Sequence, residues 1–311
     1  MMLFRKTTQI IRPTKKKTNF IGQLRCLYNF TVSSETQKIL DEASMLKHKI
    51  EENYDAADID LKATLHQKLR SLWTYHSNAI EGSTLSLSDT IFFLKEGITV
   101  EGKPLKDFLD AKNHAEAIDY MYDIVAEKKS INSYLLKSIN AILLQGISST
   151  PAMDTLGRKV NKPLIAGDYK KMPNHVLQSD NTIHRYVEPL FVQEEMENFF
   201  EWIESNLQVN HPVITASVAH YNMVRMHPFD DGNGRGARIL MNLILLRKQF
   251  SVAVIKTEDR RKYLECLKQA DRGNIDPFIQ FIASSLNWTQ QAILDELLKY
   301  QQKPTSGPRL K

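Results

Sequence analysis

One segment that is apolar on nearly every side constrains the fold of this 311-residue chain more than any other feature. It lies within a predicted helix over Arg235–Lys248. A helix without a polar face is buried, because none of its sides can face water at low cost. We therefore expect an all-α fold in which a helical bundle surrounds a buried central helix. The apolar residues of this segment are Ile239, Leu240, Met241, Leu243, Ile244, Leu245 and Leu246.

Most of the chain after Ser34 repeats apolar residues three and four positions apart, which is the spacing of amphipathic helices. Strand patterns are scarce. The one extended stretch that we expect, Lys170–Ser179, follows a turn at Gly167 and Asp168. Besides the central helix, we expect helices at Thr36–Asn53, Asp58–Ile80, Leu105–Lys128, Ile131–Gln145, Gln193–Asn206, Pro212–Met226, Arg260–Asp271 and about Pro277–Tyr300.

The basic residues behind the net charge of +5 are concentrated at the start of the chain. Residues 1–34 hold seven Lys and Arg and no acidic residue, which leaves 34 basic and 36 acidic residues elsewhere. The body therefore has no basic excess for nucleic acid, and we expect no such partner. For the leader we expect a disordered basic arm, with a mitochondrial presequence as the alternative.

Two further absences in the sequence bear on the compartment. No apolar run approaches the roughly 18 residues of a membrane span. Cys26 and Cys266 are too few and too far apart for a disulfide framework or a zinc site. We expect a reducing, soluble environment, with the cytoplasm favoured over the mitochondrion.

Residues 227–238 read HPFDDGNGRGAR and combine several groups that suit phosphate chemistry. His227 can accept a proton near neutral pH, as a general base for a hydroxyl nucleophile must. Asp231 offers one hard oxygen ligand, which is enough for Mg²⁺ when phosphates and waters complete its coordination. These two residues are the candidate base and the candidate metal ligand.

The second half of the motif has the features of an anion site. Gly232 and Gly234 let backbone amides approach phosphate oxygens, and Asn233 between them can add a side-chain donor. Arg235 and Arg238 lie one helical turn apart on one face, where they can clamp phosphates. The motif also stands at the start of the predicted buried helix, whose free N–H groups and dipole favour an anion.

The motif resembles the signature of the Fic family, HPF-x-[D/E]-GNGR-x-x-R, at every fixed position. The resemblance extends from about Leu61 to Leu286. It includes GKPLKDFLDAKNHAEAI from Gly102, GDYK from Gly167, where the family often has G-x-Y-R, and DRRKYLECLKQADRGN from Asp259. It implies the all-helical Fic fold with a small β-hairpin flap, and a nucleotidyltransferase that moves AMP from ATP to a hydroxyl of a target protein.

The resemblance also implies a role for each motif residue. His227 would take the proton of a target Ser, Thr or Tyr, and Asp231 would hold Mg²⁺ across the α- and β-phosphates. The glycine loop, residues 232–234, would bind those phosphates, with Arg235 in support. Arg238 would grip the γ-phosphate before pyrophosphate leaves. A homodimer is expected from the family.

An inhibitory motif of the family, [S/T]-x-x-x-E-[G/N], is matched by Ser77, Glu81 and Gly82. Ser77 and Glu81 share one helical face, and Gly82 ends the helix. By resemblance, Glu81 pairs with Arg238 and blocks the place of the γ-phosphate. The same glutamate can orient water to remove AMP in some relatives, so inhibition, AMP removal or both remain open.

Three further positions follow from the resemblance. The flap around Val176 and Ser179 is expected to hold a target segment by strand-like pairing, and for His175 we favour an exposed loop position. Tyr263 is a candidate stacking wall for adenine, with a core position as the alternative. Asp271 stands where the family commonly has Asn.

Other functions stay open alongside a self-inhibited adenylyltransferase. They are a Fic enzyme with another donor (a different nucleotide, phosphocholine or phosphate), a non-catalytic nucleotide-sensing regulator and a DNA-binding regulator. Too little chain follows Ile282 for an added winged helix. We divide the chain into a leader (1–34), an N-terminal helical region (35–130) with an inhibitory helix (about 61–82), a catalytic core (131–286), and a C-terminal helix and disordered tail (287–311).

Overall fold

The structure is a computed structural model, and it describes residues 30–153, 158–177 and 183–301. Helices dominate these residues, as expected, and two short hairpins accompany them. The helices are α1 (Ser34–Tyr54), α2 (Ile59–Ile80), α3 (Leu87–Glu96), α4 (Leu105–Ala126), α5 (Ser133–Leu143), α6 (Pro189–Asn206), α7 (Pro212–Met226), α8 (Asn233–Arg247), the 3-10 helix η1 (Thr257–Asp259), α9 (Arg260–Asp271) and α10 (Asp276–Gln301).

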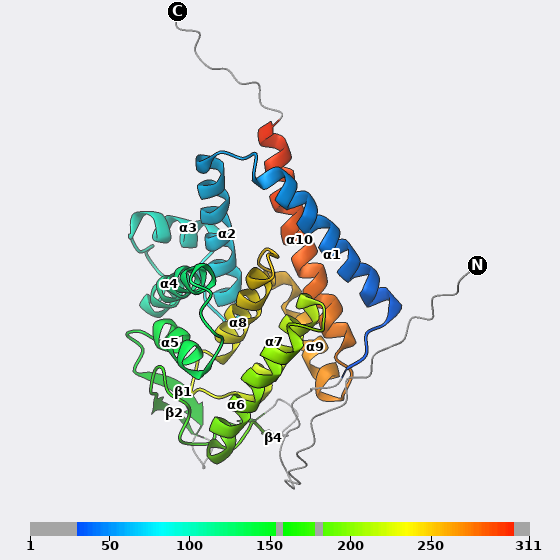
Figure 1. The fold of residues 1–311 in the computed structure, drawn as a ribbon. Helices are drawn as coiled ribbons and strands as arrows, with labels where there is room; N and C mark the ends of the chain where they lie inside the picture. The colour runs from blue at the N-terminus through cyan, green and yellow to red at the C-terminus, as the bar shows by residue number, and fades with distance from the viewer. Residues whose placement is uncertain (1–29, 154–157, 178–182, 302–311) are drawn as a thin grey trace, which may run out of the picture.

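The expected central helix is α8, which begins two residues earlier than predicted, at Asn233. Its residues from Arg235 to Leu245 are all buried. α7 packs along it, and α2, α4 and α5 also contact it (Figure 1). The prediction of a buried central helix is therefore confirmed, and its first turn lies deep inside the molecule.

The first and last helices of the described chain lie side by side. α1 runs along α10, in blue and red in Figure 1, and the pair flanks the bundle. Asp276 at the start of α10 accepts hydrogen bonds from the backbone of Ser33 and the hydroxyl of Thr36. The N-terminal helical region is thus attached to the C-terminal helix rather than forming a separate unit.

One helix, α3, is missing from the sequence prediction. Its boundary signals are present nonetheless: Ser86 and Asp89 form a capping box, and Gly97 ends the helix with a left-handed φ of 70°. With only 10 residues and one buried side chain, Thr90, the helix lacks a long apolar stripe. Periodicity alone therefore does not reveal it.

The strands also differ from the expectation. β1 (Ser149–Met153) pairs antiparallel with β2 (Lys159–Pro163), a hairpin that was not predicted. In the expected stretch Lys170–Ser179, β3 covers only Val176–Leu177 and pairs with β4 (Ile183–His184). Pro173 interrupts this stretch, because proline cannot donate to a strand ladder.

Within the described residues, no helix is long and apolar enough to cross a membrane. Most of the leader (residues 1–29) and most of the tail (302–311) lie outside the described residues, as does Ser179.

Candidate active site

The motif loop spans residues 227–232 and joins two buried helices that pack against each other. The first-turn N–H groups of α8 have no earlier carbonyl of their own helix to bind. These N–H groups form the positive end of the helix dipole, and they lie at this loop. The junction is therefore suited to an anion.

His227 ends α7 in a left-handed conformation, with φ 49° and ψ 58°, and its N–H donates to the carbonyl of Met223 at 3.0 Å. Burial, together with the charge of Lys170, lowers the pKa of His227 to about 3. A backbone contact with Val224 and the charge of Glu81 act in the opposite direction. The imidazole is therefore neutral near pH 7, which is the form that accepts a proton.

The two neighbouring aspartates of the loop have different surroundings. Asp230 is buried, and its Oδ1 lies 2.8 Å from Nζ of Lys162 on β2. Asp231 keeps 32% of its side chain exposed; its Oδ1 accepts a hydrogen bond from the N–H of Gly232 at 2.6 Å and lies 3.8 Å from Nη2 of Arg235. Asp231 is thus the loop carboxylate that can reach a ligand.

The surroundings of Asp231 fit a metal held jointly with a nucleotide. In the part of the chain that the structure describes, no group of three or more His, Cys, Asp or Glu side chains could hold a metal ion. Magnesium in nucleotide sites commonly takes one or two carboxylates and fills its shell with phosphates and waters. Asp231 is therefore the residue that would hold Mg²⁺.

The two glycines of the loop are needed for different reasons. Gly232 has a left-handed φ of 76°, and an added Cβ would lie 3.1 Å from Nδ2 of Asn140. An added Cβ on Gly234 would lie only 2.4 Å from Oε1 of Glu81. The carboxylate of Glu81 therefore already occupies the space against Gly234, where an anion would lie.

Two asparagine side chains fix the backbone of the loop. Asn233 accepts a hydrogen bond from the N–H of Phe229 and donates one to its carbonyl, both at 2.9 Å. The side chain of Asn233 therefore fixes the loop backbone, and the second N–H of its amide and its backbone N–H remain as donors. Asn140 donates to the carbonyl of Asp231 and accepts from the N–H of Gly167, also at 2.9 Å.

Arg238 is 1% exposed and faces the end of α2. Its Nε donates to Oγ of Ser77 at 2.9 Å, and its Nη2 donates to the Ser77 carbonyl at 2.9 Å and to Oε1 of Glu81 at 2.7 Å. The two residues of the inhibitory motif thus contact the arginine that the resemblance assigns to the γ-phosphate.

Arg235 has a different partner, which sequence reasoning missed. Its Nη1 lies 2.5 Å from Oδ1 of Asp110 on α4, and both side chains are buried. The other oxygen of Asp110 lies 2.5 Å from Nζ of Lys106. Burial lowers the pKa of Arg235, but the charges of Asp110, Asp231 and Glu81 outweigh burial and raise it. A carboxylate on the apolar face of the predicted helix was the available signal.

Glu81 lies where α2 ends, and Gly82 follows with a φ of 101°. Burial raises the pKa of Glu81, but the charge and hydrogen bond of Arg238, with the charges of Arg235 and His227, lower it overall. The side chain is 43% exposed. Glu81 is therefore an ionised carboxylate that reaches from the rim of the site to Arg238.

The end of α2 is also held from the opposite side. The N–H of Thr257 donates to Nδ1 of His76 at 3.1 Å, and Nε of Arg260 donates to the carbonyl of Ile80 at 2.8 Å. Ser77 and Glu81 thus belong to a helix end that η1 and α9 keep against α8.

The flap differs in part from the expectation. Val176 is 46% exposed on β3, where it pairs with His184 of β4, and Ser179 lies outside the described residues. His175 is not an exposed loop histidine: its Nε2 lies 3.1 Å from Oε1 of Glu188, and its Nδ1 accepts from the N–H of Tyr186 at 3.2 Å. His175 therefore fixes the base of the flap.

Lys170, which stands where the family often has arginine, is buried beside the motif loop. Burial lowers its pKa to about 8. Its backbone N–H donates to the carbonyl of Pro228 at 2.8 Å, and its Nζ donates to Oδ1 of Asn174 at 2.7 Å. Asn174 in turn donates to the carbonyl of Phe229 at 2.9 Å. The sequence gives no signal for Asn174.

Tyr263 is not a stacking wall. It is 3% exposed, its hydroxyl lies 3.3 Å from Nε2 of His220, and its ring packs on Phe278 and Phe281. The inward face of the amphipathic helix α9 explains this core position. Asp271 accepts a hydrogen bond from the hydroxyl of Tyr221 at 3.0 Å.

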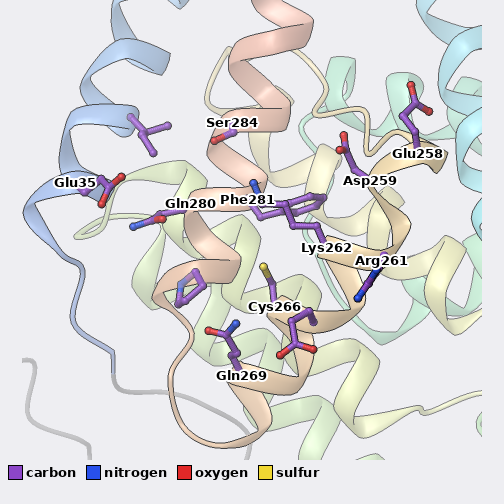
Figure 2. Close-up of a pocket in the computed structure, with 13 residues that line it drawn as sticks. Glu35, Glu258, Asp259, Arg261, Lys262, Cys266, Gln269, Gln280, Phe281 and Ser284 are labelled. Carbon is purple, nitrogen blue, oxygen red and sulfur yellow. The ribbon is translucent and has the colours of Figure 1, made fainter.

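A groove of about 800 Å³ lies elsewhere, between α1, α9 and α10. Figure 2 shows Arg261, Lys262, Cys266 and Phe281 among its lining residues. No residue of the motif loop lines it. At the motif loop, the carboxylate of Glu81 lies against Gly234.

Comparisons with known proteins match the region of the chain that contains this site to a known family. Residues 130–245 match the Fic/DOC family. The chain is 36% identical over 221 residues to "Protein adenylyltransferase Fic" of Nematostella vectensis, covering 71% of this chain and 48% of the relative. It is 30% identical over 216 residues to "Protein adenylyltransferase fic-1" of Caenorhabditis elegans, covering 68% and 39%. The chain thus spans about half the length, or less, of these curated relatives.

Two solved structures have the same fold. Fic-1 from C. elegans superposes with a TM-score of 0.72 at 25% identity, covering 86% of this chain and 74% of that one. A Fic domain containing signaling protein from Bacteroides thetaiotaomicron gives a TM-score of 0.71 at 25% identity, covering 86% and 97%.

Proposed function

The chain belongs to the Fic/DOC family, and on that premise we propose that it is a self-inhibited protein adenylyltransferase, which transfers AMP from ATP to a Ser, Thr or Tyr hydroxyl of a target protein. The names of the curated relatives support the reaction class. The contact between Arg238 and Glu81 is the single observation that carries the self-inhibition.

In the proposed reaction, neutral His227 takes the proton of the target hydroxyl. The hydroxyl oxygen forms a bond to the α-phosphorus of ATP, and the bond from that phosphorus to the pyrophosphate oxygen breaks. Magnesium, when bound through Asp231, supplies positive charge to the phosphates. Backbone N–H groups of residues 232–234 stabilise the charge that develops on the phosphate oxygens.

Inhibition follows from competition for one arginine. Arg238 can grip a γ-phosphate only when its Nη2 is free of Glu81, whose carboxylate lies 2.7 Å away. The same carboxylate lies against Gly234, where phosphate oxygens would need room. ATP must therefore displace Glu81 to bind productively.

The test uses purified protein, α-³²P-labelled ATP and Mg²⁺, with the wild type, Glu81→Gly, and Glu81→Gly/His227→Ala. We expect weak labelling by the wild type, strong labelling of lysate proteins or of itself by Glu81→Gly, and none by the double variant. Absence of labelling by Glu81→Gly would contradict AMP transfer to the proteins supplied. Labelled phosphocholine and other nucleotides would then test the alternative donors.

Removal of AMP is a second candidate function of the same site. The exposure of Glu81 favours it, because a carboxylate at 43% exposure beside the anion cradle can orient a water molecule. Incubating an AMP-modified target with wild type and Glu81→Gln separates the two functions. Release of AMP by the wild type alone supports hydrolysis through Glu81.

We also propose that the chain forms a homodimer through α3 and the segment that leads into α4. Four large apolar side chains are exposed there, and clustered apolar surface on a folded protein commonly marks an interface. They are Ile91, Phe92, Ile98 and Leu105.

A further inference from the structure

The rings of Tyr186 and His227 stack in parallel. Their centroids are 3.9 Å apart and their planes differ by 16°. Tyr186 lies between β4 and α6, 41 positions before His227, so only the fold brings them together. The side chain of Tyr186 is half-buried.

This stack matters because few other contacts orient the histidine: among the described residues, a backbone contact with Val224 is the one hydrogen-bonding influence on its imidazole, and it does not meet the geometry of a normal hydrogen bond. Nδ1 of His227 is buried and has no hydrogen-bond partner among the described residues. Histidines that act as bases are usually held by a carboxylate or carbonyl on the ring nitrogen that does not take the proton. The left-handed backbone of His227 fixes where the side chain begins, but the imidazole can still rotate. Packing against Tyr186 therefore adds a constraint on the plane of this ring that the Val224 contact alone does not supply.

Tyr186 is itself held in place from several sides. Its N–H donates to Nδ1 of His175, which Glu188 pairs on the other ring nitrogen. The ring of His184 packs edge-on against it, with centroids 4.9 Å apart. Nζ of Lys170 lies 5.7 Å from the centre of the Tyr186 ring. A ring fixed in this way can serve as a rigid support for its neighbour.

The face of an aromatic ring is also electron-rich and attracts cations. When His227 accepts a proton it becomes an imidazolium, in a half-buried position close to the positive charge of Lys170. A parallel aromatic ring at 3.9 Å is the group placed to stabilise that cation. The same contact would therefore favour the protonated state formed during the reaction.

We propose that Tyr186 is a positioning residue for His227: its ring holds the imidazole in the plane needed to receive the target proton, and its face stabilises the resulting imidazolium. This inference rests on the proposed function. The proton moves from the target oxygen to the imidazole as that oxygen bonds to the α-phosphorus and pyrophosphate leaves. Tyr186 takes no part in bond making, so the ring matters and the hydroxyl does not.

The experiment compares variants in the Glu81→Gly background, with α-³²P-labelled ATP. Tyr186→Leu removes the aromatic face, and we expect the maximal rate to fall about tenfold or more, with an unchanged KM for ATP. Tyr186→Phe keeps the ring and should restore the rate to within about threefold of the parent, because stacking does not use the hydroxyl. Tyr134→Leu is the matched control, since Tyr134 is 77% exposed on α5.

The outcomes separate this inference from the proposed function. If the Glu81→Gly parent itself transfers no AMP, the proposed function fails, and the inference that rests on it fails with it. If the parent is active and Tyr186→Leu is equally fast or faster, the inference alone is overturned. A rate lost equally in Tyr186→Leu and Tyr186→Phe would also overturn it, by showing that the hydroxyl matters. An intact thermal unfolding transition for Tyr186→Leu shows that a slower rate is not a folding defect.

Discussion

Arg235 and Arg238 come from the same short motif and are both buried, yet they have different counterions. Asp110 pairs with Arg235, and the side chains of both residues are buried, so the pair is held inside the protein. Arg238 is paired with Glu81, whose side chain is 43% exposed at the end of a helix. Of the two arginines, Arg238 is therefore the one that can exchange its carboxylate for a phosphate.

Removing Glu81 should make the stability of the protein depend on anions. In Glu81→Gly, the buried guanidinium of Arg238 loses its carboxylate, and a buried charge without a partner is costly. We expect 1 mM pyrophosphate to raise the melting temperature by a few degrees, about 1 kcal/mol, in Glu81→Gly and much less in the wild type. Thermal unfolding measures this. An equal rise of the melting temperature in Glu81→Gly/Arg238→Gln would show that pyrophosphate binds at another site.

Asp110 should be needed for stability. Asp110→Asn leaves Arg235 buried without its carboxylate, and we expect a loss of about 3–5 kcal/mol in the free energy of unfolding. Asp119→Asn is the control, because Asp119 pairs with Arg70 near the surface at 47% exposure and should cost about 1 kcal/mol or less. Urea unfolding of both variants gives the comparison. Equal losses would show that the burial of the Asp110 pair is immaterial.

At the scale of elements, the contact between Glu81 and Arg238 depends on where α2 ends. Ser77 and Glu81 reach Arg238 because η1 and α9 hold the last turn of α2 through Thr257 and Arg260. A helix end held by few hydrogen bonds can be released at modest cost. The proposed inhibition would therefore depend on α9 as well as on Glu81.

Loosening that attachment should raise activity while Glu81 is intact. Arg260→Ala removes the hydrogen bond to the carbonyl of Ile80, which has a charged donor and is worth about 1.5–3 kcal/mol. We expect a several-fold increase in AMP transfer over the wild type, measured with labelled ATP. Arg261→Ala is the matched control, because Arg261 lines the groove in Figure 2. Equal AMP transfer by Arg260→Ala and Arg261→Ala would contradict a role of α9 in the proposed inhibition.

The meeting point of α7, α9 and α10 should make the fold sensitive to acid. Burial, with the charge of Arg238, lowers the pKa of His220 from 6.5 to about 3. The unfolded chain therefore binds a proton before the native state does, and stability present above pH 6.5 is lost as pH falls from 6.5 towards 3. We expect this histidine alone to contribute a loss of about 1.4 kcal/mol between pH 7.5 and 5.5.

Urea unfolding at these two pH values tests the contribution of His220. The loss between them should be smaller by about that 1.4 kcal/mol in His220→Gln. His48→Gln, at a position whose side chain is 69% exposed, should leave the loss unchanged. The same loss in His220→Gln as in the wild type would contradict the assignment.

At the scale of the molecule, the fold agrees with solved Fic structures over most of the chain, whereas the part of the chain that aligns with the Nematostella vectensis relative covers only 48% of that relative. Target choice, assembly and cytoplasmic location therefore stay proposals. The apolar side chains of α3 and the start of α4 are where assembly can be tested.

A charge placed on this surface should separate the proposed dimer. Leu105 is 68% exposed, and Leu105→Lys would bury an unpaired ammonium in the interface, which is strongly unfavourable. We expect a monomer by light scattering where the wild type is a dimer. Leu190→Lys is the control, since Leu190 is 84% exposed on α6. A monomeric wild type at high micromolar concentration would contradict the proposal.

Local chemistry made several features predictable from the sequence. The burial of α8, the all-α fold and the shared face of Ser77 and Glu81 follow from patterns within one helix, where spacing alone sets which side chains lie together. The boundaries of α7 and α9 agree with the prediction for the same reason. The short helix α3 and the hairpin of β1 and β2 were missed because neither has a long periodic pattern.

Only the tertiary structure decided how distant segments meet at the motif. Glu81 against Gly234, Asp110 beside Arg235, and Tyr186 on His227 each join residues between 41 and 153 positions apart in the sequence. Tyr263 and Asn233 likewise took structural roles because neighbours from other turns and helices offered them partners. By itself the sequence determined which chemistry is available. Packing determined which groups are already paired and which remain free to act, because pairing depends on contacts that no local pattern encodes.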